Sequence, residues 1–98
     1  MIAEFSIVPM TGEESISTHV ARILRMVEAS GLDHRLTAMG TIVEGEPEAV
    51  FGLILDCHME MKQVANRVLT RISIDDRGDE MNRIDRKTQS VLEKRNDQ

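Results

Sequence analysis

Glu44 is the residue whose type and position best suit the binding of a small polar ligand. It follows a β-prone run that carries hydroxyl groups, and a carboxylate at a strand end can accept hydrogen bonds and attract a cation. The alternative is that Glu44 is simply solvated ahead of a helix. Nearby hydroxyl, charged and sulfur-bearing side chains and a turn glycine add further candidates. These candidates are Glu4, Ser6, Thr37, Met39, Gly40, Thr41 and Arg71.

The segment before Glu44 predicts a β-hairpin. Two β-prone runs, residues 36–38 and 41–43, flank Met39-Gly40, and glycine readily supplies the positive φ of a tight turn. With a two-residue turn, Leu36 lies opposite Val43, Thr37 opposite Ile42, and Ala38 opposite Thr41. One sheet face then carries Thr37, Ile42 and Glu44, and the other carries Leu36, Ala38, Thr41 and Val43.

The size, charge and aromatic content of the chain exclude several classes of function. At 98 residues the chain has room for one domain with a modest core, and its net charge of −5 argues against a nucleic-acid surface. Tyr and Trp are absent from the sequence, which removes the platform on which an RNA-recognition sheet stacks bases. Without a signal-peptide pattern or a long apolar run, we expect a cytoplasmic protein that does not enter the membrane.

Metal binding and catalysis have little support in the sequence. His19, His34 and His58 do not form a spaced ligand cluster with Cys57, so we expect no metal site. Cys57 lies within an apolar helical pattern and is predicted to be a buried thiol. No strained nucleophile turn, catalytic triad or glycine-rich phosphate loop is recognisable, so we expect no catalytic residues and no enzymatic activity.

Alternation and helical spacing predict the order strand, helix, strand, strand, helix, strand. Residues 2–8 alternate as a strand, and residues 67–75 form the last strand. The first helix stops at Gly31, and the second runs from Pro47 to about Val64. This order predicts an α+β, ferredoxin-like βαββαβ sandwich. Its four-stranded antiparallel sheet places the first strand between the third and the fourth, and two helices cover one face.

Beyond this ferredoxin-like domain, residues 1–78, we expect an extra helix within a C-terminal extension, residues 79–98. Asp79 could cap that helix. We predict that it lies against a neighbouring subunit or frays at its charged end. Its apolar stripe, too narrow to build a core alone, consists of Met81, Ile84, Val91 and Leu92.

The second helix is more apolar than one sheet requires. Beside its expected core stripe it carries Phe51, Leu55 and Met59, which widen the apolar arc. In a small acidic protein, this arc predicts a partner subunit and hence a homo-oligomer. The alternative is an ordinary core helix with a few exposed apolar residues.

The sheet face opposite the helices is predicted to be mixed in character. Glu4 and Arg71 fall on neighbouring antiparallel strands of this face and could pair. Two interpretations follow. Either the face is exposed and has ordinary cross-strand pairs, or two sheets stack and leave a polar cavity at the edge of their contact.

Three blocks of the sequence resemble the small YkoF-like thiamine-binding family. They are Ile-Ala-Glu-Phe-Ser-Ile-Val-Pro at residues 2–9, Leu-Thr-Ala-Met-Gly-Thr-Ile-Val-Glu-Gly at residues 36–45, and Ile-Ser-Ile-Asp-Asp-Arg at residues 72–77. The Met-Gly-Thr…Glu-Gly and Ile-Asp-Asp-Arg parts are the specific ones. The sequence departs from the family at Ala38, where Pro is usual, and at Arg71, where a small hydroxyl residue is usual.

The resemblance implies a single ferredoxin-like domain that assembles into a homo-oligomer, with a tetramer favoured. It also implies that the ligand is thiamine or its pyrimidine portion, bound at a subunit interface by Glu44 and its neighbours without a further cofactor. Two other functions stay open from the residues alone. They are an oligomeric regulatory module that binds another metabolite, such as an amino acid, and a purely structural oligomer.

Overall fold

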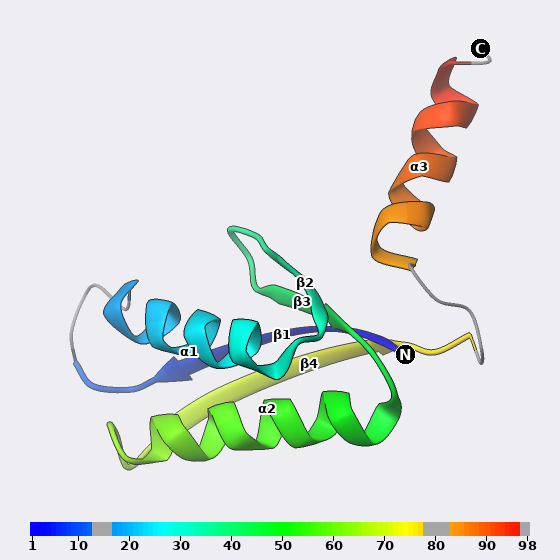
Figure 1. The fold of residues 1–98 in the computed structure, drawn as a ribbon. Coiled ribbons are helices and arrows are strands. Elements are labelled where there is room, and N and C mark those ends of the chain that lie inside the picture. Colours follow the sequence, from blue (N-terminus) through cyan, green and yellow to red (C-terminus); the bar gives the residue numbers. More distant parts are fainter. Residues whose placement is uncertain (13–16, 78–82, 97–98) are drawn as a thin grey trace.

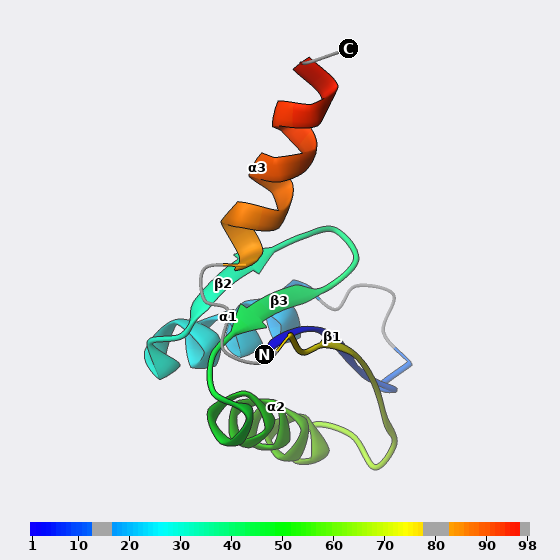
Figure 2. The same ribbon diagram turned by 90° about the vertical axis from the view of Figure 1, so that its right-hand side faces the viewer.

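Four antiparallel strands form one sheet in the order β2-β3-β1-β4, and two helices, α1 and α2, cover one of its faces (Figure 1). The computed structural model describes residues 1–12, 17–77 and 83–96. A third helix, α3, stands on the other side of the sheet (Figure 2). This architecture confirms the ferredoxin-like α+β fold with an extra C-terminal helix. The elements are β1 (Ile2–Pro9), α1 (Ser17–Ser30), β2 (Asp33–Leu36), β3 (Thr41–Glu44), α2 (Pro47–Lys62), β4 (Val68–Asp75) and α3 (Arg83–Asn96).

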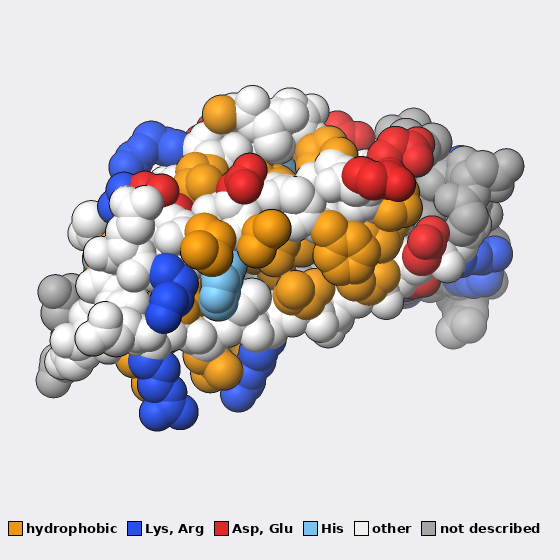
Figure 3. Space-filling view, turned by 90° about the horizontal axis from the view of Figure 1, so that it is seen from below, with side chains coloured by type: hydrophobic (Ala, Val, Ile, Leu, Met, Phe, Trp, Pro, Cys, Tyr) orange, Lys and Arg blue, Asp and Glu red, His pale blue; other side chains and the backbone are white. Residues whose placement is uncertain are grey.

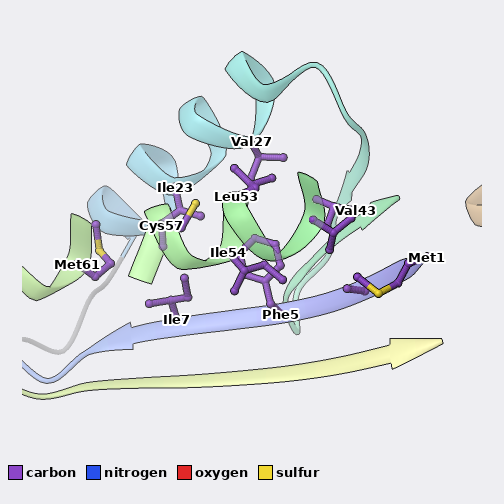
Figure 4. Close-up of a cluster of buried hydrophobic side chains, with 12 residues drawn as sticks. Met1, Phe5, Ile7, Ile23, Val27, Val43, Leu53, Ile54, Cys57 and Met61 are labelled. Carbon is purple, nitrogen blue, oxygen red and sulfur yellow. The ribbon is translucent and has the colours of Figure 1, made fainter. Parts of the chain in front are cut away.

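The core lies between the sheet and the two covering helices (Figure 4). Alternate residues of β1 point into it, as the period of two in the sequence predicts, and Phe5 is its only aromatic side chain. Because Phe51 is exposed, aliphatic and methionine side chains fill the remaining space. Each large apolar side chain buried in this way contributes about 1.5–3 kcal/mol to folding. The buried apolar residues are Met1, Ala3, Phe5, Ile7, Ile23, Val27, Val43, Val50, Leu53, Ile54, Cys57 and Met61.

Local signals explain where the two covering helices end. Gly31 has φ of 77° directly after α1, which confirms it as the C-terminal stop. Pro47 occupies the first turn of α2, as predicted. The helix ends at Lys62, slightly earlier than the predicted Val64, because the Val64 N–H donates to the Met61 carbonyl three residues back and tightens the final turn.

The hairpin forms, but its turn is longer than predicted. Leu36 pairs with Thr41, where the two-residue turn would have paired it with Val43, so residues 37–40 form the connection. The shift is by two residues, so Leu36 and Thr41 remain on the predicted side. The Thr37 side chain explains the longer loop. Its Oγ1 accepts hydrogen bonds from the backbone N–H groups of Met39 (3.2 Å) and Gly40 (3.1 Å), and its hydroxyl donates to the Gly40 carbonyl (2.8 Å).

The prediction that Gly40 supplies a positive φ is wrong. Among the glycines that the structure describes, Gly12 and Gly31 have that conformation. Gly40 is required by space instead, since a Cβ atom there would lie 2.8 Å from the Phe5 carbonyl oxygen of the adjoining strand.

Cys57 is a buried thiol, as predicted, and is fully shielded from solvent. Burial, followed by the negative charges of Asp56 and Glu60, raises the pKa of the Cys57 thiol to about 11. Compared with an ordinary thiol, about a hundredfold less thiolate is then present at pH 8.

We therefore expect iodoacetamide to label native Cys57 at least a hundredfold more slowly than the same residue in the urea-unfolded chain. Equal labelling rates, measured by intact mass, would contradict this burial.

Candidate functional site

Helix α3 partly covers the sheet face that α1 and α2 leave open (Figure 2). Its first turn is held at three points. The Ile84 backbone N–H donates to Glu44 Oε1 on β3 (3.4 Å), Asp85 forms an ion pair with Arg35 of β2, and Lys87 Nζ lies 2.8 Å from Asp75 Oδ2 of β4. The ion pairs are exposed to solvent and contribute little each, so α3 is seated mainly by its apolar and backbone contacts. The predicted cap at Asp79 and the stripe residue Met81 lie outside the described residues.

A groove of about 790 Å³ runs between this open face and the first two turns of α3. Its walls combine isoleucine residues with carboxylates, hydroxyls, one amide and two cations, a mixture that can both bury and orient a small polar molecule. The residues that line it are Ile2, Ala3, Glu4, Arg35, Leu36, Thr37, Ile42, Ser73, Ile74, Asp75, Ile84, Asp85, Lys87, Thr88 and Gln89.

Glu44 adjoins this groove at the base of α3. Its pairing with Ile2 places it on the open sheet face, yet it is only 4% exposed. The alternative of a solvated Glu44 is therefore wrong. The reason is that α3 folds back over the end of β3, so that Ile84, a groove residue, donates its N–H to the Glu44 carboxylate. The first turn of a helix is favourable for a negative charge, because its N–H groups point outward from the helix end.

Two other predicted residues, Glu4 and Thr37, line the groove directly. Glu4 lies opposite Ser73 on β4, and both are groove residues. Thr37 reaches the groove from the hairpin loop, although its hydroxyl already bonds within that loop. The structure thus brings the Glu4 and Thr37 side chains together with Ile42 on one face, next to Glu44.

The remaining predicted residues lie elsewhere. Ser6 and Arg71 are opposite each other further along the open face, so Arg71 is a diagonal neighbour of Glu4. Within the part of the chain that the structure describes, no ion pair joins Glu4 to Arg71. Met39 is 82% exposed at the tip of the hairpin, beside Gly40, and Thr41 is buried on the side that faces the helices.

Sequence reasoning missed the wall that α3 contributes. Ile84 and Thr88 are four residues apart on the helix and face the groove together, with Lys87 and Gln89 beside them. The stripe of Ile84, Val91 and Leu92 was visible in the sequence. The surface on which this stripe packs could not be predicted, because the sequence pattern does not indicate which surface the helix contacts. Arg35 was also missed, since an arginine on a short edge strand carries no distinguishing signal.

An apolar surface, here called the α2–β4 patch, lies on the opposite side of the molecule (Figure 3). It consists of Phe51, Leu55 and Met59 on α2, with Ile72 and Ile74 on β4, and each is 42–59% exposed. Ile74, close to the end of β4, also borders the groove. A hydrogen-bond contact of 2.6 Å between His58 Nδ1 and Thr70 Oγ1 joins the two elements. Exposure of five large apolar residues on adjoining elements is typical of a surface that is covered in an assembly.

The described part of the chain contains no helix that is long and apolar enough to cross a membrane. Within the same ranges, no three His, Cys, Asp or Glu side chains gather in a way that could hold a metal ion.

Comparison with known proteins agrees with this fold. The UPF0045 protein MJ1052 of Methanocaldococcus jannaschii is 29% identical over 95% of this chain and 93% of its own length. UPF0045 protein YqgV of Bacillus subtilis is 35% identical over 92% of each chain. The crystal structure of MJ1052 superposes with a TM-score of 0.86 and covers 94% of this chain and 95% of that one.

A structure from Thermotoga maritima, described as a candidate thiamine biosynthesis/salvage protein, has a TM-score of 0.75 at 19% identity and covers 89% of this chain and 96% of that one. At that identity it shows the shared fold alone. A family model described as thiamine-binding protein matches residues 3–92, from β1 to the second half of α3. Because that match spans most of the sequence, the chain belongs to the thiamine-binding protein family.

Proposed function

We propose that this protein is a cytoplasmic, non-enzymatic binding protein that holds thiamine or its pyrimidine precursor in the groove under α3. The observation that carries the proposal is the groove itself, with the shielded Glu44 carboxylate at its edge. Membership of the thiamine-binding family supports the choice of ligand. We further propose a homo-oligomer, with a tetramer favoured, in which the groove lies close to a subunit interface.

The groove suits the two chemical halves of thiamine. Its volume of about 790 Å³ falls within the range common for small-molecule sites. The carboxylates of Glu4 and Asp75 suit the cationic thiazolium, and the isoleucine side chains suit its ring. The aminopyrimidine needs both donors and acceptors, which Ser73, Thr88 and Gln89 offer.

The proposed site is centred on Glu44, Glu4 and Thr37. Ser6 and Arg71 extend it along the open face, and Met39 with Gly40 belongs to the hairpin loop at its rim. Thr41 supports the hairpin from the core side. The groove is open to solvent in a single copy, so a second subunit would enclose the ligand further.

Isothermal titration calorimetry tests the ligand. We expect thiamine to bind with a measurable heat, the isolated hydroxymethylpyrimidine to bind more weakly, and amino acids not to bind. Binding of an amino acid in place of thiamine would favour the second candidate, a regulatory module for another metabolite. Absence of binding by all of them at millimolar concentration would contradict the proposal and leave the structural oligomer.

Arg71 should decide between thiamine and its phosphates. Its guanidinium is exposed on the open face beside Ser6, where it can pair with a phosphate and repels the thiazolium. We expect thiamine phosphate to bind more tightly than thiamine, and we expect Arg71→Thr to remove that preference. If calorimetry shows that the unaltered protein binds thiamine and thiamine phosphate with equal affinity, Arg71 does not contact the ligand.

One observation favours a purely structural role for Glu44. The Glu44 carboxylate accepts the Ile84 N–H, and this contact alone could explain why an acidic residue is found there. In that case Glu44 anchors α3 and does not contact a ligand. Glu44→Gln separates the two roles, because the loss of an anchor affects stability more than binding.

A further inference from the structure

A second cavity, here called the β4–α3 cavity, lies between the end of β4 and a side of α3 that the groove does not use. Its volume is about 660 Å³. On α3 it is lined by Arg86, Ser90 and Glu93, which recur at helical spacing, whereas Ile84 and Thr88 line the groove. Two sides of the same helix therefore border two different cavities.

The Ile-Asp-Asp-Arg block at residues 74–77 supplies the other wall of the β4–α3 cavity, through Asp75 and Arg77. Asp75 ends β4 and borders both cavities, whereas Arg77 borders this cavity and does not line the groove. Ligand binding in the groove therefore gives Arg77 no role. Lys87 Nζ lies 2.8 Å from Asp75 Oδ2, and this ion pair joins the two walls.

Positive charge gathers at the inner end of the cavity, where β4 meets α3. Arg77 follows β4, and Arg86 and Lys87 lie near the start of α3, so three cations come from two separate segments. The described lining of this end includes one carboxylate, that of Asp75, so three positive charges and one negative charge give +2. The whole chain has a net charge of −5. A local positive excess inside a cavity attracts anions.

The other carboxylate of the described lining, that of Glu93, belongs to the outer end. It follows Arg86 by seven residues, which is about 10 Å along the helix axis. Between these two residues, Ser90 offers a hydroxyl group and Gln89 an amide, and both can donate hydrogen bonds. The inner end is therefore rich in donors and positive charge, and the negative charge of Glu93 lies apart from it.

This arrangement suits a phosphate group better than a carboxylate. A phosphate carries up to two negative charges and three strong acceptor oxygens, so it can use several cations at once. The planar fork of a guanidinium matches the spacing of phosphate oxygens and can donate two parallel hydrogen bonds to them. A volume of about 660 Å³ exceeds the needs of one phosphate and has room for a diphosphate or a phosphate ester.

We propose that the β4–α3 cavity is a phosphate-binding site, in which Arg77 and Arg86 contact the phosphate oxygens and Lys87 lies beside them. This site does not depend on which ligand the groove holds. Lys87 and Gln89 border both cavities, so the two sites adjoin at this turn of α3. The phosphate belongs either to a separate molecule or to a groove ligand whose tail passes Lys87.

Isothermal titration calorimetry of the full chain with pyrophosphate tests the site. We expect pyrophosphate to bind, and we expect Arg77→Gln and Arg86→Gln each to lower its affinity about tenfold or more, because each removes a charged donor. Both side chains are exposed, so thermal unfolding should change little. Arg95→Gln is the matched control, since Arg95 is an exposed arginine of α3 outside the cavity, and it should leave the affinity unchanged.

Three results would overturn the proposal. They are no binding of pyrophosphate at millimolar concentration, an equal loss of affinity in Arg95→Gln, which would indicate diffuse charge attraction, and binding of succinate as tight as that of pyrophosphate. A protein that binds pyrophosphate but no thiamine would retain this site and lose the proposed function of the groove.

Thiamine diphosphate identifies the source of the phosphate. If the phosphate is the tail of a groove ligand, thiamine diphosphate binds more tightly than thiamine, and Arg86→Gln removes the difference. If the phosphate belongs to a separate molecule, pyrophosphate binds equally well with and without saturating thiamine, and Arg86→Gln changes the affinity for pyrophosphate alone. Either result supports the site.

Discussion

Replacement of Glu44 by Gln is expected to weaken thiamine binding at least tenfold while the protein remains folded. The amide keeps the shape of the side chain and can still accept the Ile84 N–H, but it loses the negative charge. A hydrogen bond to a charged group contributes about 1.5–3 kcal/mol, which corresponds to a tenfold or greater change in affinity. Calorimetry with thiamine gives the affinity, and thermal unfolding without ligand gives the stability.

Two comparisons identify what Glu44 contacts. If Glu44 contacts the aminopyrimidine, Glu44→Gln should lower the affinities for the isolated pyrimidine and for thiamine by the same factor. If Glu44 contacts the thiazolium charge, the same change should lower the affinity for thiamine alone. Glu46→Gln provides the matched control, since Glu46 is exposed two residues further on. Unchanged thiamine affinity in Glu44→Gln, together with a lower unfolding temperature, would assign Glu44 to the anchoring of α3.

The fold could be predicted because local pattern and packing agree in this chain. Ala3, Phe5 and Ile7 alternate along β1, and every one of them is buried. On α2, Val50, Leu53, Ile54, Cys57 and Met61 follow helical spacing and form the buried side. With one face of β1 and one side of α2 so clearly apolar, the sheet and its covering helices have few alternative arrangements.

The site was harder to predict because it depends on contacts between distant parts of the chain. Glu44 was found from its strand-end position, but its burial follows from α3, which returns 40 residues later. The hairpin turn illustrates the same limit. A two-residue turn agreed with the sequence pattern, but the Thr37 hydroxyl stabilises a four-residue loop, and the approach of Phe5 determines the need for Gly40.

The two exposed apolar surfaces lie on different elements and can act independently. The α2–β4 patch lies on α2 and β4, whereas Val91 and Leu92, which are 65% and 39% exposed, lie on the outer half of α3. Two distinct isologous contacts on one protomer generate a closed dimer of dimers. The proposed tetramer therefore needs no third interface, and disruption of either surface should leave a dimer.

Phe51→Glu and Leu55→Glu should each separate the assembly across the α2–β4 patch. Both side chains are about half exposed in one copy, so the changes should cost the isolated fold little. At a covered interface, each glutamate would be buried without a partner, which costs about 3–5 kcal/mol and raises the dissociation constant by at least a hundredfold. Light scattering at micromolar concentration should show half the wild-type mass.

Ala49→Glu is the matched control for the patch, because Ala49 is also exposed on α2 but lies on a different side of the helix. Its mass should equal that of the wild type. If Phe51→Glu also keeps the wild-type mass, the patch is an ordinary exposed surface, and any assembly forms through another surface of the chain. If Phe51→Glu and the double variant Val91→Glu with Leu92→Glu on α3 each give dimers and their combination gives monomers, two independent two-fold contacts explain the tetramer, because neither variant alone removes both.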